Sequence, residues 1–326
     1  MPFFFLCYSF KIRKLILDNC KIVLFNKLPP NVFDSAIVDN IIFIFQKTEE
    51  KNRLNSLILF DDILDKTKIK FINQSTFINN DKNLFDVPVD KVSDEILVKM
   101  KIDSDNLGKI ALNYIGIMTG GQKTMIANEP IFKNSKPVLS GKEIDKWFYK
   151  DIGKYVNFDK SKIHSNDNED VYLSNIKILL RKTGKNLVAC LDDKQFYSIQ
   201  SLYNIVIKDK SYKERYVLAL LNSKLFTFIY NKFFITNPEV FPYIKRRHLD
   251  MLPIKKVDDK IQGIFIEIVA KIILLTKNDD YSNSQEKKIQ VKDYEKQIDQ
   301  MVYKLYGLTK EEIEVVEKTA EKLHRD

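Results

Sequence analysis

Three groups of polar and basic residues, each on a predicted loop, have the chemistry needed to contact a polyanion. Lysine and arginine neutralise phosphates, and backbone amides, hydroxyls and side-chain amides bond to phosphate oxygens or to base edges. A solvated turn carries the same residue types, so each group could also be plain surface. In chain order the groups are Thr119, Gly120, Gly121, Gln122 and Lys123; Arg181, Lys182 and Lys185; and Lys245, Arg246 and Arg247.

The positions of these residues predict how each group is presented. The two glycines of the first group allow the backbone to approach a phosphate closely. The second group flanks the turn of a predicted hairpin, so its cations are expected to project from a rigid base. The third group is anchored between two apolar segments, 241–244 and 249–253. We therefore predict that all three groups contact DNA.

Two further sets of residues are weaker candidates for DNA contact. Lys133, Lys136 and Lys142 surround a Pro-Val-Leu-Ser-Gly block. The second set contains two glutamines, and glutamine can form two hydrogen bonds to adenine, so these residues could read base edges. That set is Gln195, Tyr197 and Gln200.

Residues that could support catalysis are sparse. His164, His248 and His324 lack metal-ligand spacing, so each is predicted to be a surface residue. The string Asp192-Asp193-Lys194 superficially suggests a magnesium-dependent nuclease, but such strings arise by chance among 44 acidic residues. The sequence predicts no catalytic residue and no metal site, while an unrecognised site in a complete enzyme stays open.

Composition and charge favour an anionic partner in the cytoplasm. The chain has 326 residues, a formal net charge of +9 and a pI near 9.1, and release of counterions drives such chains toward phosphates. Three scattered cysteines argue against a disulfide framework or a zinc site. The apolar start, 1–10, is too short to span a membrane. We expect neither secretion nor membrane insertion.

Hydrophobic periodicity predicts the elements that must position these residues. Helices are expected over 11–20, 215–228, 261–276 and 293–306, and strands over 21–26, 40–47, 176–181 and 187–191. Gly184 predicts a tight hairpin turn, and Gly307 predicts a left-handed helix cap. Thr309 and Glu312 are spaced as in a capping box at the start of a helix. Strand 40–47 has five consecutive apolar residues and is expected to be covered on both faces.

Four short blocks follow one another in an order that resembles a known DNA-reading domain. They are Gly116-Ile-Met-Thr-Gly-Gly, Lys136-Pro-Val-Leu-Ser-Gly-Lys-Glu-Ile, Leu218-Ala-Leu-Leu-Asn-Ser-Lys-Leu and Leu252-Pro-Ile. The resemblance is to the TaqI-like C-terminal specificity domain of adenine-specific DNA methyltransferases and fused type IIG restriction-modification enzymes. It implies that this region recognises the target sequence.

The segment before these blocks resembles the end of a methyltransferase catalytic domain. The matching residues are Val32, Phe33, Ala36, Val38, Ile41, Ile42, Ile44 and Lys47. The resemblance implies the last strands of the sheet that binds S-adenosylmethionine in the parent enzyme, a sheet that needs about seven strands.

The motifs of that catalytic domain are missing. An Asn-Pro-Pro-Tyr motif is absent, because Asn237-Pro-Glu-Val-Phe has Glu239 at the second proline and Leu28-Pro-Pro-Asn has Leu28 at the asparagine. No Gly-x-Gly-x-x-Gly cofactor loop occurs either. We expect no cofactor in this chain, with S-adenosylmethionine belonging to the parent enzyme.

These observations predict an α/β (α+β) chain with four parts. Residues 1–50 would be a fragment of a doubly wound methyltransferase sheet, and 51–108 a linker and entry to the recognition domain. Residues 109–256 would form a mixed-sheet specificity domain, and 257–326 a helical C-terminal region.

The predicted function is sequence-specific binding of double-stranded DNA, as the target-recognition part of an adenine-N6 methyltransferase or restriction-modification system. A catalytic methyltransferase polypeptide would dock on the exposed strands 22–25 and 41–45. The alternative left open is a truncated relic that has no partner.

Overall fold

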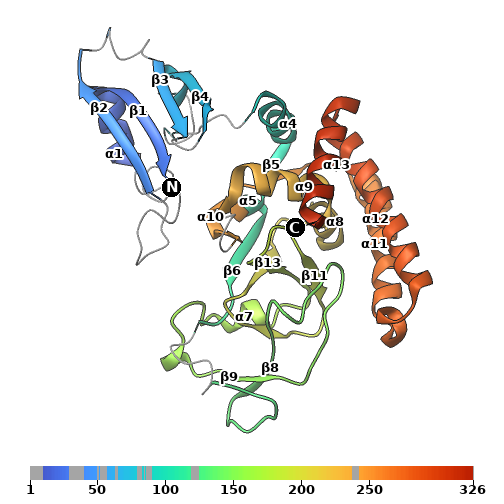
Figure 1. Cartoon of the computed structure of the whole chain (residues 1–326). Coiled ribbons are helices and arrows are strands. Elements are labelled where there is room, and N and C mark those ends of the chain that lie inside the picture. The colour runs from blue at the N-terminus through green and yellow to red at the C-terminus, as the bar shows by residue number, and fades with distance from the viewer. Residues whose placement is uncertain are drawn as a thin grey trace. The chain divides into compact units, whose positions relative to one another are not determined.

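The computed structural model describes residues 10–28, 40–49, 51, 57–62, 65–78, 83, 85, 90–118, 125–236 and 242–325. The chain divides into two compact units, 1–89 and 90–326 (Figure 1). Among the described residues, no helix combines the length and the apolar character that a membrane span needs.

The N-terminal unit is built on a four-stranded sheet in the order β2-β1-β3-β4. β1 pairs antiparallel with β2 and parallel with β3, and β3 pairs antiparallel with β4. A small core of Ile22, Phe25, Phe77 and Phe85 packs on one face. The elements are α1 (Phe10–Asn19), β1 (Cys20–Leu28), β2 (Asn40–Lys47), β3 (Leu57–Asp62), β4 (Asp65–Asn73) and the short α3 (Ser75–Ile78).

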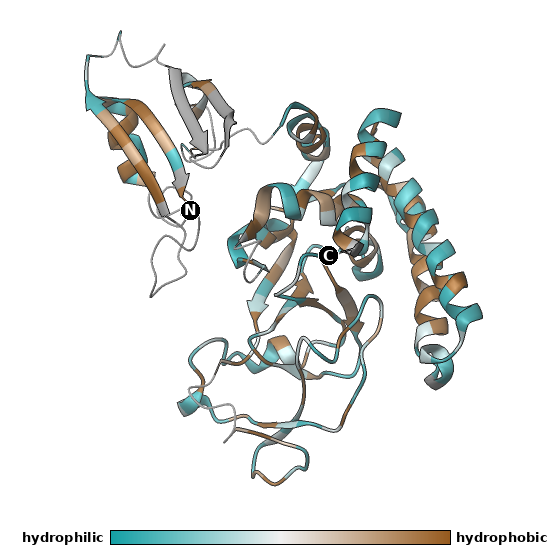
Figure 2. Ribbon diagram, viewed as in Figure 1, coloured by the Kyte–Doolittle hydropathy of each residue, from teal (hydrophilic) through white to brown (hydrophobic). Residues whose placement is uncertain are grey.

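The predicted helix and both predicted strands of this unit are present, but the expected burial of β2 is wrong. Figure 2 shows β1 and β2 as hydrophobic over most of their length. Nevertheless, Ile42, Ile44 and Phe45 are 40%, 48% and 51% exposed. β2 lies at the edge of the described sheet, where it pairs only with β1.

The region predicted as a linker, 51–108, contributes to both units. β3 and β4 lie within it, and β3 joins the first sheet by pairing Leu24 with Leu59 and Phe25 with Phe60. α4 (Lys91–Lys101), β5 (Ser104–Asn106) and α5 (Leu107–Ile110) begin the second unit. Lysine- and aspartate-rich strands such as β4 have little hydrophobic periodicity, so the sequence pattern did not indicate them.

The second unit has a central antiparallel sheet in the order β11-β10-β13-β6. Successive side chains point to opposite faces, and both faces are buried. Toward the helices, Ile178, Leu180 and Ile205 join the large core. On the other face, Leu179 and Cys190 join a smaller core with Leu139, Ile144 and Phe196. The strands are β6 (Ala111–Ile115), β10 (Lys177–Arg181), β11 (Ala189–Asp192) and β13 (Leu202–Ile207).

A second sheet, in the order β12-β8-β9-β7, packs around a separate cluster of aromatic residues. In this cluster the rings of Tyr172 and Tyr197 stack with their centroids 4.7 Å apart. The elements are β7 (Ile126–Ala127), β8 (Ser135–Leu139), β9 (Tyr155–Asn157), η3 (Lys160–Lys162), α7 (Glu169–Tyr172) and β12 (Tyr197–Ser198).

The helix predicted over 215–228 is two helices, α8 (Glu214–Asn222) and α9 (Lys224–Ile229). Ser223 divides them because it has an extended backbone and its hydroxyl accepts a hydrogen bond from the Phe226 N–H, which makes it the N-cap of α9. Asp299 of α12 accepts a hydrogen bond from the Lys224 N–H at the same helix start, over 2.8 Å. α9 continues into a π-helix, η4 (Tyr230–Phe234).

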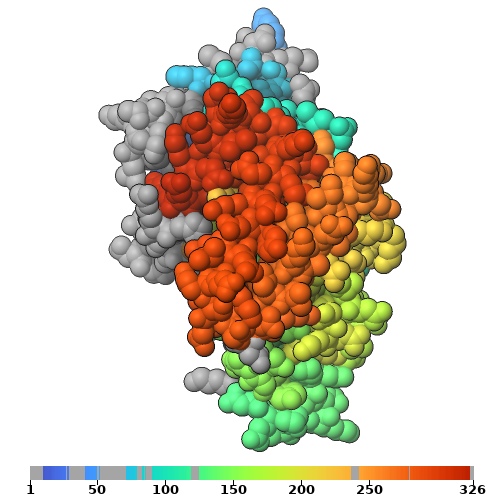
Figure 3. Space-filling model, turned by 90° about the vertical axis from the view of Figure 1, so that its right-hand side faces the viewer, coloured from blue at the N-terminus to red at the C-terminus, as the bar shows by residue number. Residues whose placement is uncertain are grey.

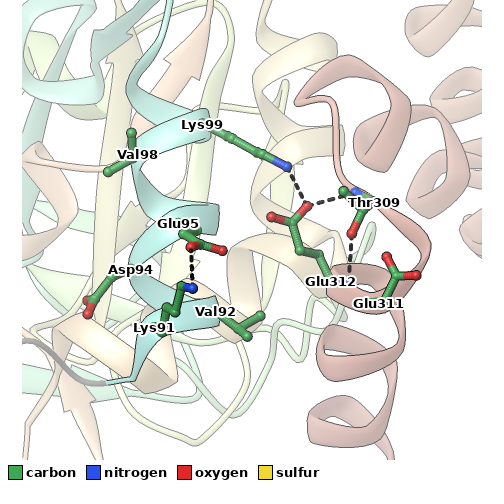
Figure 4. Close-up of a pocket in the computed structure, with 9 residues that line it drawn as sticks. All are labelled: Lys91, Val92, Asp94, Glu95, Val98, Lys99, Thr309, Glu311 and Glu312. Carbon is green, nitrogen blue, oxygen red and sulfur yellow. Dashed lines mark hydrogen bonds and ion pairs between the residues drawn. The ribbon is translucent and has the colours of Figure 1, made fainter.

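The C-terminal region is helical, as predicted, and Figure 3 shows its helices covering one side of this unit. Gly307 has a φ of +66° after α12, and the capping box is present. Glu312 N–H donates to Thr309 Oγ1, and Thr309 N–H donates to Glu312 Oε2 over 2.7 Å (Figure 4). The elements after η4 are β14 (Ile235–Thr236), β15 (Tyr243–Ile244), α10 (Arg246–Asp250), β16 (Pro253–Lys255), α11 (Asp259–Thr276), η5 (Asp279–Ser282), α12 (Gln285–Leu305) and α13 (Lys310–Arg325).

Candidate nucleic-acid interface

The predicted basic hairpin forms between β10 and β11. The two strands pair antiparallel, with Lys177 opposite Asp192 and Leu180 opposite Ala189. At the turn, Gly184 has a φ of +121°, a conformation that residues with a Cβ adopt only under strain. The sequence therefore located both the strands and the residue that permits the turn.

The structure brings two of the predicted basic groups together. Thr183 forms an antiparallel bridge with Tyr243. Two further backbone hydrogen bonds flank it, from Gly184 N–H to Pro242 O over 2.8 Å and from Ile244 N–H to Lys182 O over 3.0 Å. The hairpin tip and the segment that leads into Lys245, Arg246 and Arg247 are thus joined side by side.

An aromatic ring lies at the centre of this junction. The Lys182 Nζ atom is 5.9 Å and the Lys245 Nζ atom 5.8 Å from the centroid of the Tyr243 ring. Ammonium groups at such distances are attracted by the negative face of the ring. Partial burial lowers the pKa of Lys182. One tyrosine ring therefore contacts cations from two distant parts of the sequence.

Helix α10 carries the other two cations of this group. The Arg246 guanidinium lies 5.5 Å from the centroid of the Tyr114 ring of β6, and its Nε atom is 3.8 Å from Asp250 Oδ2. Arg247 Nε donates to His248 Nε2 over 3.0 Å. We call the five residues around Tyr243 and α10 the basic cluster: Lys182, Lys185, Lys245, Arg246 and Arg247.

His248 is half-buried, and both of its ring nitrogens are hydrogen-bonded within the fold. Its Nδ1 atom lies 2.7 Å from Phe234 O, so with Nε2 accepting from Arg247 the neutral tautomer carries its proton on Nδ1. Burial, followed by the charge of Arg247, lowers its pKa to about 4.

This depressed pKa predicts a pH-dependent stability. The unfolded chain binds a proton at His248 near pH 6.5, whereas the folded chain binds it only near 4. The neutral ring therefore contributes fully to the free energy of unfolding above pH 6.5. As the pH falls from 6.5 toward 4, the free energy of unfolding decreases by about 2–3 kcal/mol. Urea unfolding followed by fluorescence of Trp147, the single tryptophan, measures this loss. His248→Gln should flatten the profile, whereas the same change at exposed His164 should not.

Comparison with known proteins places this surface in a family. The TaqI-like C-terminal specificity domain matches residues 136–254, which include the hairpin, Tyr243 and α10. Residues 136–254 are thus similar to TaqI-like specificity domains. The predicted resemblance is thereby confirmed for the part of the chain that carries the basic cluster. A search of curated proteins finds no match to the chain.

Solved structures similar to the chain come from restriction-modification enzymes. The type IIL enzyme MmeI, solved in complex with DNA, has a TM-score of 0.50 and 13% identity, over 98% of this chain and 48% of its own. The type IIG restriction endonuclease BpuSI has a TM-score of 0.40 and 10% identity, over 92% and 45%. The HsdS subunit from Thermoanaerobacter tengcongensis has a TM-score of 0.34 and 8% identity, over 66% of this chain and 50% of its own. The chain spans about half the length of MmeI, and the similarity to MmeI concerns the fold.

Within the specificity domain, Arg181 differs from the residues of the basic cluster. Its Nη2 atom donates to the carbonyl of Ile144, so the guanidinium is turned toward the loop that follows β8 and does not project from the hairpin. The other predicted members of the hairpin group, Lys182 and Lys185, are half-buried. DNA contact by Arg181 stays a prediction, and its observed contact is structural.

The remaining sequence candidates have varied surroundings. Thr119, Gly120, Gly121, Gln122 and Lys123 lie outside the described residues. Lys136 is paired with Glu169 over 3.2 Å. Tyr197 is buried and bonds to Glu169, which argues against its reading a base.

Two further features of the described residues bear on ligand binding, namely the lack of a metal-binding cluster and the presence of a surface hollow. No group of histidine, cysteine or carboxylate side chains among them could hold a metal ion. A hollow of about 600 Å³ lies between α4 and the start of α13, where Lys99 Nζ is paired with Glu312 over 2.7 Å (Figure 4). Thr309 and Glu312 of the capping box line this hollow, and their polar groups are already hydrogen-bonded to each other.

Two aromatic residues of the interface were missed by sequence reasoning. Tyr243 and Tyr114 hold cations of the basic cluster, but neither was singled out. Tyr243 stands two residues before Lys245, and an aromatic residue so close to a basic run was a usable signal. Tyr114 had no such signal, because it reaches Arg246 only through the pairing of β6 in the folded sheet.

Proposed function

We propose that the chain binds double-stranded DNA sequence-specifically, as the target-recognition part of an adenine-N6 DNA methyltransferase or restriction-modification system. One observation carries the proposal: two basic segments some sixty residues apart join around Tyr243 within a TaqI-like specificity domain. The net charge of +9 supports the same partner. In this proposal S-adenosylmethionine is bound by the parent catalytic domain.

The catalytic partner is proposed to dock on the N-terminal sheet. Ile44 pairs with Leu24, Leu24 with Leu59, and Leu59 with Phe71, so these four positions are in register across the four strands. Ile44 and Phe71 are 48% and 66% exposed, and Val23 beside them is 40% exposed. A contiguous apolar face of this kind is typical of protein interaction sites. A catalytic methyltransferase polypeptide is the partner that the resemblance of residues 32–47 implies.

The salt dependence of duplex binding tests the proposed DNA interface. If the five cations of the basic cluster each neutralise one phosphate, the logarithm of the binding constant should fall against the logarithm of salt with a slope of about −4 to −5. Fluorescence anisotropy with a labelled duplex measures this slope. Selection from a random duplex pool then gives the target sequence. Binding that ignores salt, or a pool that yields no preferred sequence, would contradict the proposal.

A further inference from the structure

The tip of the basic hairpin is held by two side chains from the π-helix η4. Tyr230 Oη donates to Gly184 O over 2.8 Å. Asn231 Nδ2 donates to Lys185 O over 2.6 Å and to Thr227 O, within its own helix, over 2.8 Å. The carbonyls of two successive tip residues are thus bonded to two successive residues of η4.

These bonds fix the side of the tip that faces η4. The opposite side of the tip is held by the backbone of the segment 242–244. On the η4 side, the carbonyls of Gly184 and Lys185 meet side-chain donors in place of a neighbouring strand. Tyr230 is only 1% exposed, so its hydroxyl has a fixed position. Asn231 is fixed by its second hydrogen bond, to Thr227.

We propose that Tyr230 and Asn231 are positioning residues that pre-organise the hairpin for DNA contact. The inference rests on the proposed function. Both residues act through the backbone of Gly184 and Lys185, and the cations of Lys182 and Lys185 make the contact itself. Loss of either donor leaves every charge in place but lowers the fraction of molecules whose tip has the binding conformation. The apparent dissociation constant rises in inverse proportion to that fraction.

The test compares three variants of the full chain. Tyr230→Phe and Asn231→Ala each remove a donor to the tip. Tyr216→Phe is the matched control, because Tyr216 is also buried and its hydroxyl donates to Lys255 O over 2.8 Å, away from the hairpin. We expect Tyr230→Phe and Asn231→Ala each to weaken duplex binding by up to about fivefold, the largest population effect of one lost hydrogen bond. The control should bind like the parent.

The salt slope separates positioning from contact. Because no cation is removed, Tyr230→Phe and Asn231→Ala should keep the parent slope, whereas Lys182→Ala should reduce its magnitude by about 0.9. Parent-like affinity in both variants, or losses no larger than that of Tyr216→Phe, would overturn the inference. If Lys182→Ala and Lys185→Ala also changed nothing, the proposed DNA interface itself would fail, so the two failures are distinguishable.

Discussion

Replacing Lys182, Lys185 and Lys245 together with alanine is expected to weaken duplex binding by about 10³-fold at physiological salt. These residues supply three of the five cations in the basic cluster, and a hydrogen bond to a charged group contributes about 1.5 kcal/mol. The slope of the binding constant against salt should decrease in magnitude by the contribution of about three phosphate contacts. Anisotropy titrations at several salt concentrations measure both quantities.

A control with the same change of net charge isolates the position of these cations. Lys292, Lys296 and Lys304 are exposed on α12, away from the hairpin. Replacing them with alanine lowers the net charge equally, but should change duplex affinity by less than about threefold if binding is local. Equal losses in the two triple variants would mean that binding follows total charge, and the basic cluster would then have no special role.

The effect is expected to exceed that of the positioning variants because it removes charge. Tyr230→Phe leaves the ammonium groups able to reach a phosphate whenever the tip adopts its bound conformation. The triple alanine variant cannot make those contacts in any conformation. Partial burial has already lowered the pKa of Lys182, so part of the cost of desolvating this cation is met in the free protein.

Elements coded by nearby residues could be predicted from the sequence. The hairpin needed only two apolar runs and Gly184, and the capping box needed only Thr309 and Glu312 three residues apart. Gly307 ended α12 for an equally local reason. In each case the partners lie within a few residues, so no knowledge of the tertiary structure was required.

Features that depend on distant residues could not be predicted in this way. Nothing in the sequence around Lys182 indicates that Tyr243, about sixty positions later, will lie beside it. The break at Ser223 was hidden because apolar residues continue at helical spacing on both sides of it. The exposure of Ile44 on β2 is not encoded by hydrophobic periodicity. The basic cluster is therefore a product of tertiary pairing between segments that were each recognisable alone.

The largest predicted effect on stability concerns a buried ion pair at the base of the same hairpin. Lys177 and Asp192 face each other across β10 and β11, and neither side chain is exposed. Lys177 Nζ lies 2.5 Å from Asp192 Oδ2 and donates to Tyr172 O over 2.7 Å. Asp192 also accepts hydrogen bonds from the Lys194 and Phe196 N–H groups, each over 2.9 Å. Its carboxylate is thus fully engaged within the fold.

Lys177→Met is expected to lower the free energy of unfolding by about 3–5 kcal/mol, because it leaves a buried carboxylate without its cation. Trp147 reports on the loss, since its backbone N–H donates to Ala189 O of β11. The neighbouring pair is the control. Lys277 Nζ is 3.0 Å from Asp193 Oδ2, but both side chains are about half exposed. Lys277→Met should therefore cost less than about 1 kcal/mol.

Lys177→Met and a further variant, Asp192→Asn, decide between a structural and a metal-binding role for Asp192. A magnesium ligand would make the folded state more stable when Mg²⁺ is added, in proportion to occupancy, and Asp192→Asn would abolish that gain. With Lys177 already in contact with the carboxylate, we expect no stabilisation by Mg²⁺ in the parent chain. We also expect Lys177→Met with Asp192→Asn to recover part of the stability lost in Lys177→Met, because the double change removes the uncompensated charge. A magnesium-dependent rise in the unfolding midpoint that Asp192→Asn removes would instead establish a cation site at this strand.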